Sequence, residues 1–166
     1  MKLNIGCGKE VLPGYLNIDQ FPMSSEVKKV DVTKFPLPFN DNQFEYIRMR
    51  NILEHIPIEA QLKLIDELYR ITTGGGLVWI RVPYGSHWTR RIDHHRGYTY
   101  ETFKHIDSYW FGKGKRFKIV HWSDHPTKIG RLLLSKYVRR FFDWAASAEF
   151  WITDIIAELE VVKEAV

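Results

Sequence analysis

The sequence has little cysteine and no long apolar run, and both absences exclude classes of protein. The single cysteine, Cys7, excludes an internal disulfide and a cysteine-based zinc site, and it is typical of a reducing compartment. No stretch approaches the roughly 18 consecutive apolar residues of a membrane-spanning helix. The first strand pattern begins at residue 2, which leaves no room for a signal peptide. We therefore expect a cytoplasmic protein.

An excess of one charge is also lacking. The 24 Lys and Arg residues outnumber the 20 Asp and Glu residues only slightly, so composition does not indicate a nucleic-acid partner. The chain has no repeats, no low-complexity tracts and no linker-like stretch. At 166 residues it is predicted to form one domain, residues 1–166, that is large enough to bury a core.

The first nineteen residues contain a strand, a glycine turn and a second strand that ends on an acid. Lys2–Ile5 alternates like a short strand, Gly6-Cys7-Gly8 interrupts it, and Leu16–Ile18 leads into Asp19. In parallel sheets this arrangement holds the ribose of a nucleotide-like cofactor. The glycines let the backbone approach the ligand, and the carboxylate accepts hydrogen bonds from the sugar hydroxyls.

The spacing of this stretch argues against a dinucleotide. A dinucleotide site needs a third glycine, a helix whose amino end holds the pyrophosphate, and an acid about 20 residues further on. Here no third glycine follows at the required place, Pro13-Gly14 interrupts any helix, and only thirteen residues separate Gly6 from Asp19. A cofactor with ribose and adenine but no phosphate needs no such helix. S-adenosylmethionine (SAM) is that cofactor.

Apolar patterns predict the remaining elements. Two helices are expected, at 58–71 after Pro57 and at about 100–110 after the capping hydroxyl of Thr99. Gly74-Gly75-Gly76 is expected to end the first of them. Further strands are expected at 27–32, 44–49, 77–82, 117–122 and 157–162. Together these elements predict a parallel α/β sheet in which the closing pair contributes an antiparallel strand.

An ordered series of motifs runs from residue 2 to about residue 103 and resumes at 159–162. In chain order it comprises the glycine turn with Asp19, then Asp31-Val32, Leu37-Pro38-Phe39, Phe44–Ile47, Ile52–Ile56, Glu67–Ile71, Gly74–Gly76, Arg81-Val82-Pro83 and His95–Thr99. This series resembles class I SAM-dependent methyltransferases, and more closely the short type-11-like predicted SAM-dependent methyltransferases. The resemblance implies a seven-stranded Rossmann-like sheet, mostly parallel with one antiparallel strand. The chain departs from the usual fold of this family in its reduced helices on one face, and the apolar pattern of residues 123–152 predicts a helical insert before the last strand.

The resemblance further implies which residues bind the cofactor. Those expected near its methionine and ribose portions are Gly6, Cys7, Gly8 and Asp19, and the adenine amino group is expected at Asp31 or the Val32 backbone. Arg50, Asn51 and His55 are expected at the methionine end. Three of these residues could instead have a purely structural role. Asp19 could be a turn or cap residue, Asp31 could cap the end of its strand, and His55 could fix the start of the helix that follows it.

Base catalysis and metal binding are separate questions. A base is needed only for a hydroxyl or protonated amine acceptor, and an Asp93–His95 pair would suit that role. Alternatively, His95 only anchors its loop. The other histidines, such as His94, His105, His121 and His125, have spacings that match no fixed ligand pattern, so we expect no metal site.

The short chain keeps clear helices for only one face of its sheet. We hypothesise that residues 130–151, which include Phe141 and Trp144, cover the other face in the same chain or in a homodimer partner. An uncovered site suits a bulky acceptor, such as a glycan, a lipid-linked sugar or a macromolecule, more than a tiny buried one. The expected acceptor is a sugar or glycan, or another small molecule. The alternative is a non-catalytic module that binds RNA or protein through the basic, aromatic C-terminal region, and contact of that region with a membrane surface stays open. Its basic residues are Lys113–Lys118, Lys128, Arg131, Lys136, Arg139 and Arg140.

Overall fold

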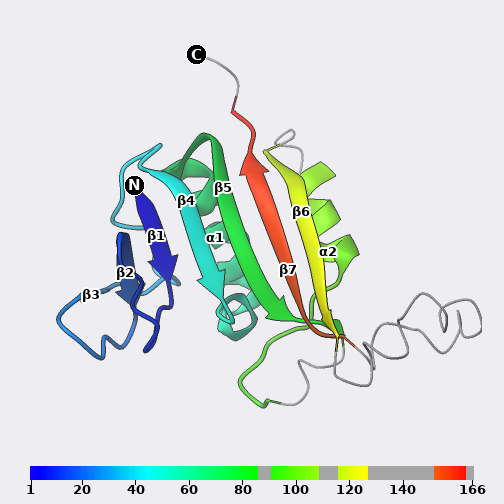
Figure 1. Ribbon diagram of the computed structural model, residues 1–166, viewed down its shortest axis with the longest axis horizontal. Coiled ribbons are helices and arrows are strands. Elements are labelled where there is room, and N and C mark those ends of the chain that lie inside the picture. Colours follow the sequence, from blue (N-terminus) through cyan, green and yellow to red (C-terminus); the bar gives the residue numbers. More distant parts are fainter. Residues whose placement is uncertain (86–90, 109–115, 127–151, 164–166) are drawn as a thin grey trace, which may run out of the picture.

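The computed structural model describes residues 1–85, 91–108, 116–126 and 152–163. Seven strands form one sheet in the order β3-β2-β1-β4-β5-β7-β6 (Figure 1). Every pairing is parallel except those of β7, which runs antiparallel to β5 and β6. The strands are β1 (Lys2–Ile5), β2 (Tyr15–Asp19), β3 (Val27–Lys29), β4 (Phe44–Arg50), β5 (Thr72–Pro83), β6 (Phe117–Pro126) and β7 (Ile152–Val161). The predicted mostly parallel seven-stranded sheet is confirmed.

Two α-helices lie on the same face of this sheet (Figure 1). Helix α1 (Ile58–Ile71) begins after Pro57, packs against β5 and buries Leu64, Ile65 and Leu68 on its inner side. Helix α2 (Tyr100–Ser108) packs against β6 and buries Phe103. A short 3-10 helix, η1 (Leu53–His55), follows β4. Within the described chain, no helix is long and apolar enough to cross a membrane.

The face of the sheet opposite α1 and α2 carries several polar side chains. One row of register partners crosses five strands, from β2 to β7, and comprises Asn17, Asn4, Arg48, Trp79 and Glu158. The Asn4 Nδ2 donates to Asn17 Oδ1 at 2.9 Å, and the Arg48 guanidinium bonds Asn4 and lies 5.0 Å from the Trp79 ring centre. Because side chains alternate between the two faces along these strands, the polar side chains of this face find partners within the sheet itself. The proposed covering segment 130–151 lies outside the described residues.

Several element ends differ from the sequence expectations. Strand β5 starts at Thr72, earlier than the expected residue 77, and includes the three glycines. Thr72 adopts an extended backbone conformation directly after α1 and pairs with Phe44. Strand β3 stops at Lys29 instead of reaching Asp31. Strand β6 continues to Pro126, so the first part of the expected helical insert 123–152 is strand. The rest of that insert, up to Trp151, lies outside the described residues.

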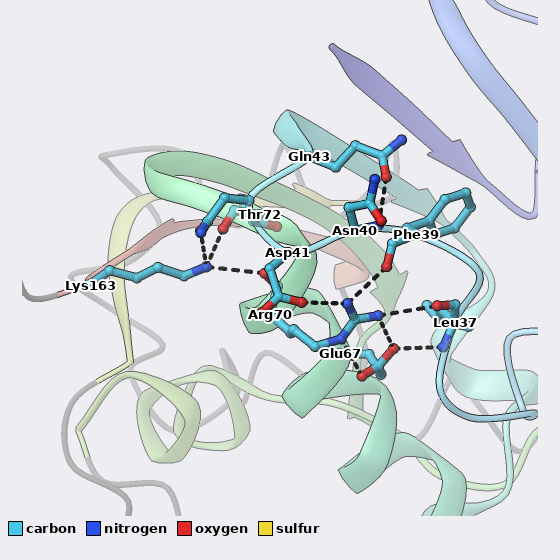
Figure 2. Close-up of polar contacts among 10 residues, drawn as sticks. Leu37, Phe39, Asn40, Asp41, Gln43, Glu67, Arg70, Thr72 and Lys163 are labelled. Atoms are coloured by element: carbon cyan, nitrogen blue, oxygen red, sulfur yellow. Dashed lines mark hydrogen bonds and ion pairs between the residues drawn. The ribbon is translucent and has the colours of Figure 1, made fainter. Parts of the chain in front are cut away.

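A polar network holds the amino ends of the parallel strands (Figure 2). The Arg70 guanidinium donates to the Glu67 and Asp41 carboxylates and to the backbone carbonyls of Leu37 and Phe39, at 2.7–3.1 Å. After β7, Lys163 Nζ donates to the carbonyls of Arg70 and Thr72 and to the Asn42 side chain. At the same end, the Met1 ammonium lies 3.3 Å from the Glu45 carboxylate. This network fixes the loop before β4 and the last described residue to α1.

Candidate cofactor site

A cavity of about 220 Å³ opens where β1, β2 and β3 end. Ligands of open parallel sheets bind in this place, outside the carboxyl ends of the strands. Five predicted cofactor residues line it: Gly6, Asp19, Asp31, Val32 and His55. Six lining residues were not predicted: Gln20, Phe21, Val30, Thr33, Ile52 and Ile56.

Gly6 forms the floor of this cavity through a backbone conformation that requires glycine. Its φ is +63°, and a Cβ placed on it would lie 2.0 Å from Cδ1 of Ile52. Ile52 follows β4, so the glycine lets the loop after β4 pack directly onto the turn after β1. The glycine turn thus closes the core side of the cavity and leaves its open side to a ligand.

The Asp19 carboxylate is held in one orientation at the end of β2. Its Oδ2 accepts from the Gly8 backbone N–H at 2.8 Å, and its Oδ1 accepts from the Phe21 N–H at 2.9 Å. Each carboxylate oxygen has a second lone pair, so the group can still accept hydrogen bonds from two hydroxyls. The predicted turn role of Asp19 is therefore present, and it is compatible with the ribose role.

Asp31 caps the turn after β3 while lining the same cavity. Its Oδ1 accepts from the Thr33 backbone N–H at 3.0 Å and from the Thr33 hydroxyl at 2.6 Å. These bonds lower the pKa of Asp31 below its usual value, so the group is ionised at neutral pH. The structural alternative foreseen for Asp31 is thus observed, and its place in the cavity wall leaves the cofactor role as a prediction.

Phe21 is the residue of this cavity that sequence reasoning missed most clearly. Its side chain is 74% exposed, although it sits two residues after the fixed Asp19. An aromatic ring left in water beside a cavity offers a flat stacking surface for a base. The signal in the sequence is Gln20-Phe21-Pro22, which places an aromatic residue two positions after the acid that ends the second predicted strand.

The other predicted cofactor residues lie beside the cavity and do not line it. Cys7 is buried, its backbone N–H donates to Ile18, and burial raises the pKa of its thiol. Gly8 reaches the site only through its bond to Asp19. The Arg50 guanidinium turns to Glu10 at 2.9 Å, and Asn51 adopts φ +53° while its N–H donates to Arg81.

A second group of side chains gathers at the His55 side of the cavity. Glu54, His55 and His94 each offer one ligand-type atom, and these atoms lie within 4.8 Å of one another. The Asp93 carboxylate lies 3.2 Å from Nδ1 of His55 and also pairs with Arg91. The predicted Asp93–His95 pair is therefore corrected: Asp93 contacts His55, whereas the His95 backbone N–H donates to the Glu54 carbonyl.

Buried bonds from α1 and from the segment before α2 hold the η1 turn that carries Glu54 and His55. The Tyr98 hydroxyl donates to the Leu53 carbonyl at 3.1 Å, and the Gln61 amide donates to the carbonyls of Leu53 and Ile56. Burial raises the pKa of Glu54 to about 7. Burial also lowers the pKa of His55, although the Asp93 charge opposes this shift, so the imidazole is neutral at pH 7.

The seven-stranded sheet with a cavity at its carboxyl edge defines a Rossmann-like protein of the class I methyltransferase fold. Residues 16–80 match the family model described as a methyltransferase domain. This match and the fold confirm the resemblance to class I SAM-dependent methyltransferases that the motif series indicated, and they support SAM as the cofactor. A search of curated proteins gives no match.

Three solved structures illustrate the fold, and each is distant from this chain in sequence. A SAM-dependent methyltransferase from Archaeoglobus fulgidus is 17% identical with a TM-score of 0.68, over 96% of this chain and 85% of that chain. NodS, an N-methyltransferase from Bradyrhizobium japonicum in complex with S-adenosylhomocysteine, is 14% identical with a TM-score of 0.63, over 98% and 78%. The [4+2]-cyclase SpnF is 15% identical with a TM-score of 0.63, over 97% and 74%. The fold therefore hosts more than one reaction, and function has to be argued from the site.

Proposed function

We propose that this chain binds SAM in the cavity at the ends of β1–β3 and transfers its methyl group to an acceptor on the His55 side. The observation that carries the proposal is the fixed Asp19 carboxylate at the cavity wall. Two backbone N–H groups orient it, and its remaining lone pairs suit the two hydroxyls of a ribose. The methyltransferase-domain match over residues 16–80 supports the same cofactor.

The adenine end of the cofactor is assigned to the wall formed by Phe21 and the turn after β3. The exposed Phe21 ring supplies a stacking surface, and Asp31 or the Val32 backbone supplies polar partners for the amino group. Thr33 keeps the Asp31 carboxylate ionised and oriented. The methionine end then extends past Gly6 toward Ile52 and His55, which complete the lining.

SAM supplies an electrophilic methyl group on a sulfonium. The chain contributes mainly position, because an in-line displacement is accelerated most by holding the acceptor atom behind that methyl. The acceptor side is assigned to the surface around His55, Asp93 and the loop between Tyr84 and Tyr98. A sugar, glycan or other small molecule is the proposed acceptor class, and a base role for Asp93 or His95 stays a prediction.

Binding of S-adenosylhomocysteine, the product form of the cofactor, tests the proposal. Saturation at about 100 times the dissociation constant adds about 2.7 kcal/mol of stability, which a thermal melt detects readily. Asp19→Ala is expected to abolish the shift, whereas Glu59→Ala, at an exposed acid on α1, keeps it. No shift at millimolar ligand would reject the proposal in favour of a non-catalytic module.

A second pair of variants separates binding from folding, because Asp19 also supports its own loop. Phe21→Ala removes a 74% exposed ring and is expected to leave stability unchanged. Loss of base stacking is expected to weaken binding by about 1–2 kcal/mol, or roughly 5- to 30-fold. Met23→Ala is the matched control, since Met23 is 64% exposed and does not line the cavity. Calorimetric titration compares the two, and equal affinities would remove Phe21 from the site.

A further inference from the structure

Beside the cofactor cavity, one carboxylate and two imidazoles from two separate segments of the chain converge. Glu54 and His55 come from η1, and His94 comes from the segment between β5 and α2, about forty residues later in the chain. Their ligand-type atoms lie within 4.8 Å of one another. The His55 and His94 rings meet edge to face, with centres 4.6 Å apart.

Unsatisfied buried atoms point into this group. The Glu54 side chain is only 1% exposed, and its Oε2 has no hydrogen-bond partner within the part of the chain that the structure describes. Nδ1 of His94 is also buried and unpartnered over the same residues. A buried carboxylate oxygen without a partner costs stability, so a native structure that keeps one calls for a reason. An ion between these atoms would supply it.

We propose that Glu54, His55 and His94 bind a divalent transition-metal ion, with Zn²⁺ as the preferred ion. Two histidines and one glutamate form a three-residue donor set typical of catalytic zinc sites, which keep one open position. Two ligand atoms on one Zn²⁺ stand about 3.4 Å apart, given bonds of about 2.1 Å. Small side-chain rotations would bring the three atoms to that spacing.

The surroundings of the group support an ion. Asp93 Oδ2 lies 3.2 Å from Nδ1 of His55, so the carboxylate can accept that N–H and aim Nε2 at the metal. The nearby positive charge of Arg91 is neutralised, because Asp93 holds its Nε and Nη2 at 3.0 and 2.9 Å. Asp93 is thus a positioning residue of the site, whereas Glu54 supplies the ligand charge.

The place of the ion suggests its task, and this step rests on the proposed function. His55 belongs both to the ligand group and to the wall of the cofactor cavity. An acceptor hydroxyl in the open position would lose its O–H proton to bulk water, because the ion lowers the pKa of bound oxygen. Its oxygen keeps the electron pair that methylation requires. The acceptor class is therefore a hydroxyl compound.

Calorimetric titration of untagged, chelator-stripped protein with ZnCl₂ tests the site without any activity assay. One ion per chain is expected. Glu54→Gln and His94→Ala are each expected to weaken binding by about tenfold or more, and Asp93→Asn by about tenfold. His121→Ala, an exposed histidine on β6, should leave binding unchanged. Circular dichroism checks that each variant is folded. If Glu54→Gln does not fold, the Zn²⁺ affinity of His94→Ala decides whether the site exists.

Three outcomes overturn the proposal: no binding, binding that neither ligand variant changes, or equal loss in His121→Ala. Titration with Co²⁺ adds a second readout, because four-coordinate Co²⁺ gives an intense visible band that surface-bound ions lack. The S-adenosylhomocysteine melt is repeated on stripped protein. A ligand shift without Zn²⁺ binding rejects only the metal site, and Zn²⁺ binding without a ligand shift rejects only the proposed function.

Discussion

At the scale of single residues, Gly6 is the position where backbone conformation and packing constrain the site together. Gly6→Ala would require a left-handed alanine and would drive its Cβ into Ile52. Strain of about 1–2 kcal/mol and a clash of similar size are expected, so stability should fall by about 2–4 kcal/mol. Urea unfolding measures the loss.

Gly14→Ala is the matched control for the clash. Gly14 also has positive φ, at +78°, but a Cβ there meets no atom within 4 Å. Only the strain of about 1 kcal/mol is expected at this position. If both variants lose the same stability, the contact between Gly6 and Ile52 does not matter to the fold.

The site was predictable where one short segment determines it. Gly6 and Asp19 stand at strand ends within nineteen residues, so local pattern and parallel pairing suffice to bring them together. The group of Glu54, His55 and His94 was not predictable, because its members meet only through the loop between β5 and α2. Their spacing along the chain matches no local metal motif. The same loop turned Asp93 toward His55 instead of the predicted His95.

At the scale of elements, Arg70 ties α1 to the proline-rich loop before β4 (Figure 2). Arg70→Ala leaves two backbone carbonyls and the Glu67 carboxylate without this donor. A loss of about 2–4 kcal/mol is expected in urea unfolding. Glu45→Gln serves as the control, since that carboxylate is 61% exposed in its pair with the Met1 ammonium and should change stability by less than about 1 kcal/mol. Similar losses in both variants would argue against the network.

The Glu67–Arg70 pair also predicts a pH dependence. Hydrogen bonds from Arg70 lower the pKa of Glu67 below its usual 4.5, and the carboxylate is only 12% exposed. A group whose folded pKa is depressed stabilises the fold above its unfolded pKa and loses that effect as pH falls through the folded pKa. The stability difference between wild type and Glu67→Gln should therefore be larger at about pH 6 than at about pH 3. A difference that is constant with pH would contradict this.

The spacing of apolar residues predicted an element best where that element buries one of its faces over several helical turns. Helix α1 was expected at 58–71 and is found there, because its apolar positions follow the helical period between a proline and an extended threonine. Strand ends were predicted less well. The three glycines were expected to end the helix, yet they belong to β5, because pairing with β4 extends the strand back to Thr72. Such pairing depends on a partner strand that local sequence does not reveal.

At the scale of the whole molecule, the register of β6 and β7 allows a direct test of the segment between them. Pro126 and Ile152 are paired neighbours, so residues 127–151 can be replaced by a two-residue Asn-Gly turn. Because the face opposite α1 and α2 already carries polar side chains that pair within the described sheet, we expect this variant to fold, stay at the same oligomeric mass and keep its melting temperature within a few degrees. Chromatography with light scattering and thermal melts give the answer.

The opposite result would restore the covering hypothesis for residues 130–151. Aggregation or a large drop in melting temperature of the Asn-Gly variant would mean that the sheet needs that cover. Phe141→Asp and Trp144→Asp in the full chain would then reproduce the drop. If they leave melting temperature and mass unchanged, neither side chain contributes to covering the sheet.

The network at the amino ends of the strands has a practical consequence for handling the molecule. Met1 pairs with Glu45 at the start of β4, and Lys163 bonds the carbonyls where α1 passes into β5. Both anchors lie at the edge of the sheet opposite the cavity, which opens where β1–β3 end. A linker attached next to Met1 or Lys163 would therefore leave from the side of the sheet opposite the cavity and orient an immobilised protein with its cavity toward the solution. Sensor surfaces, fluorophores and fusion partners joined at these points are expected to leave the cavity open.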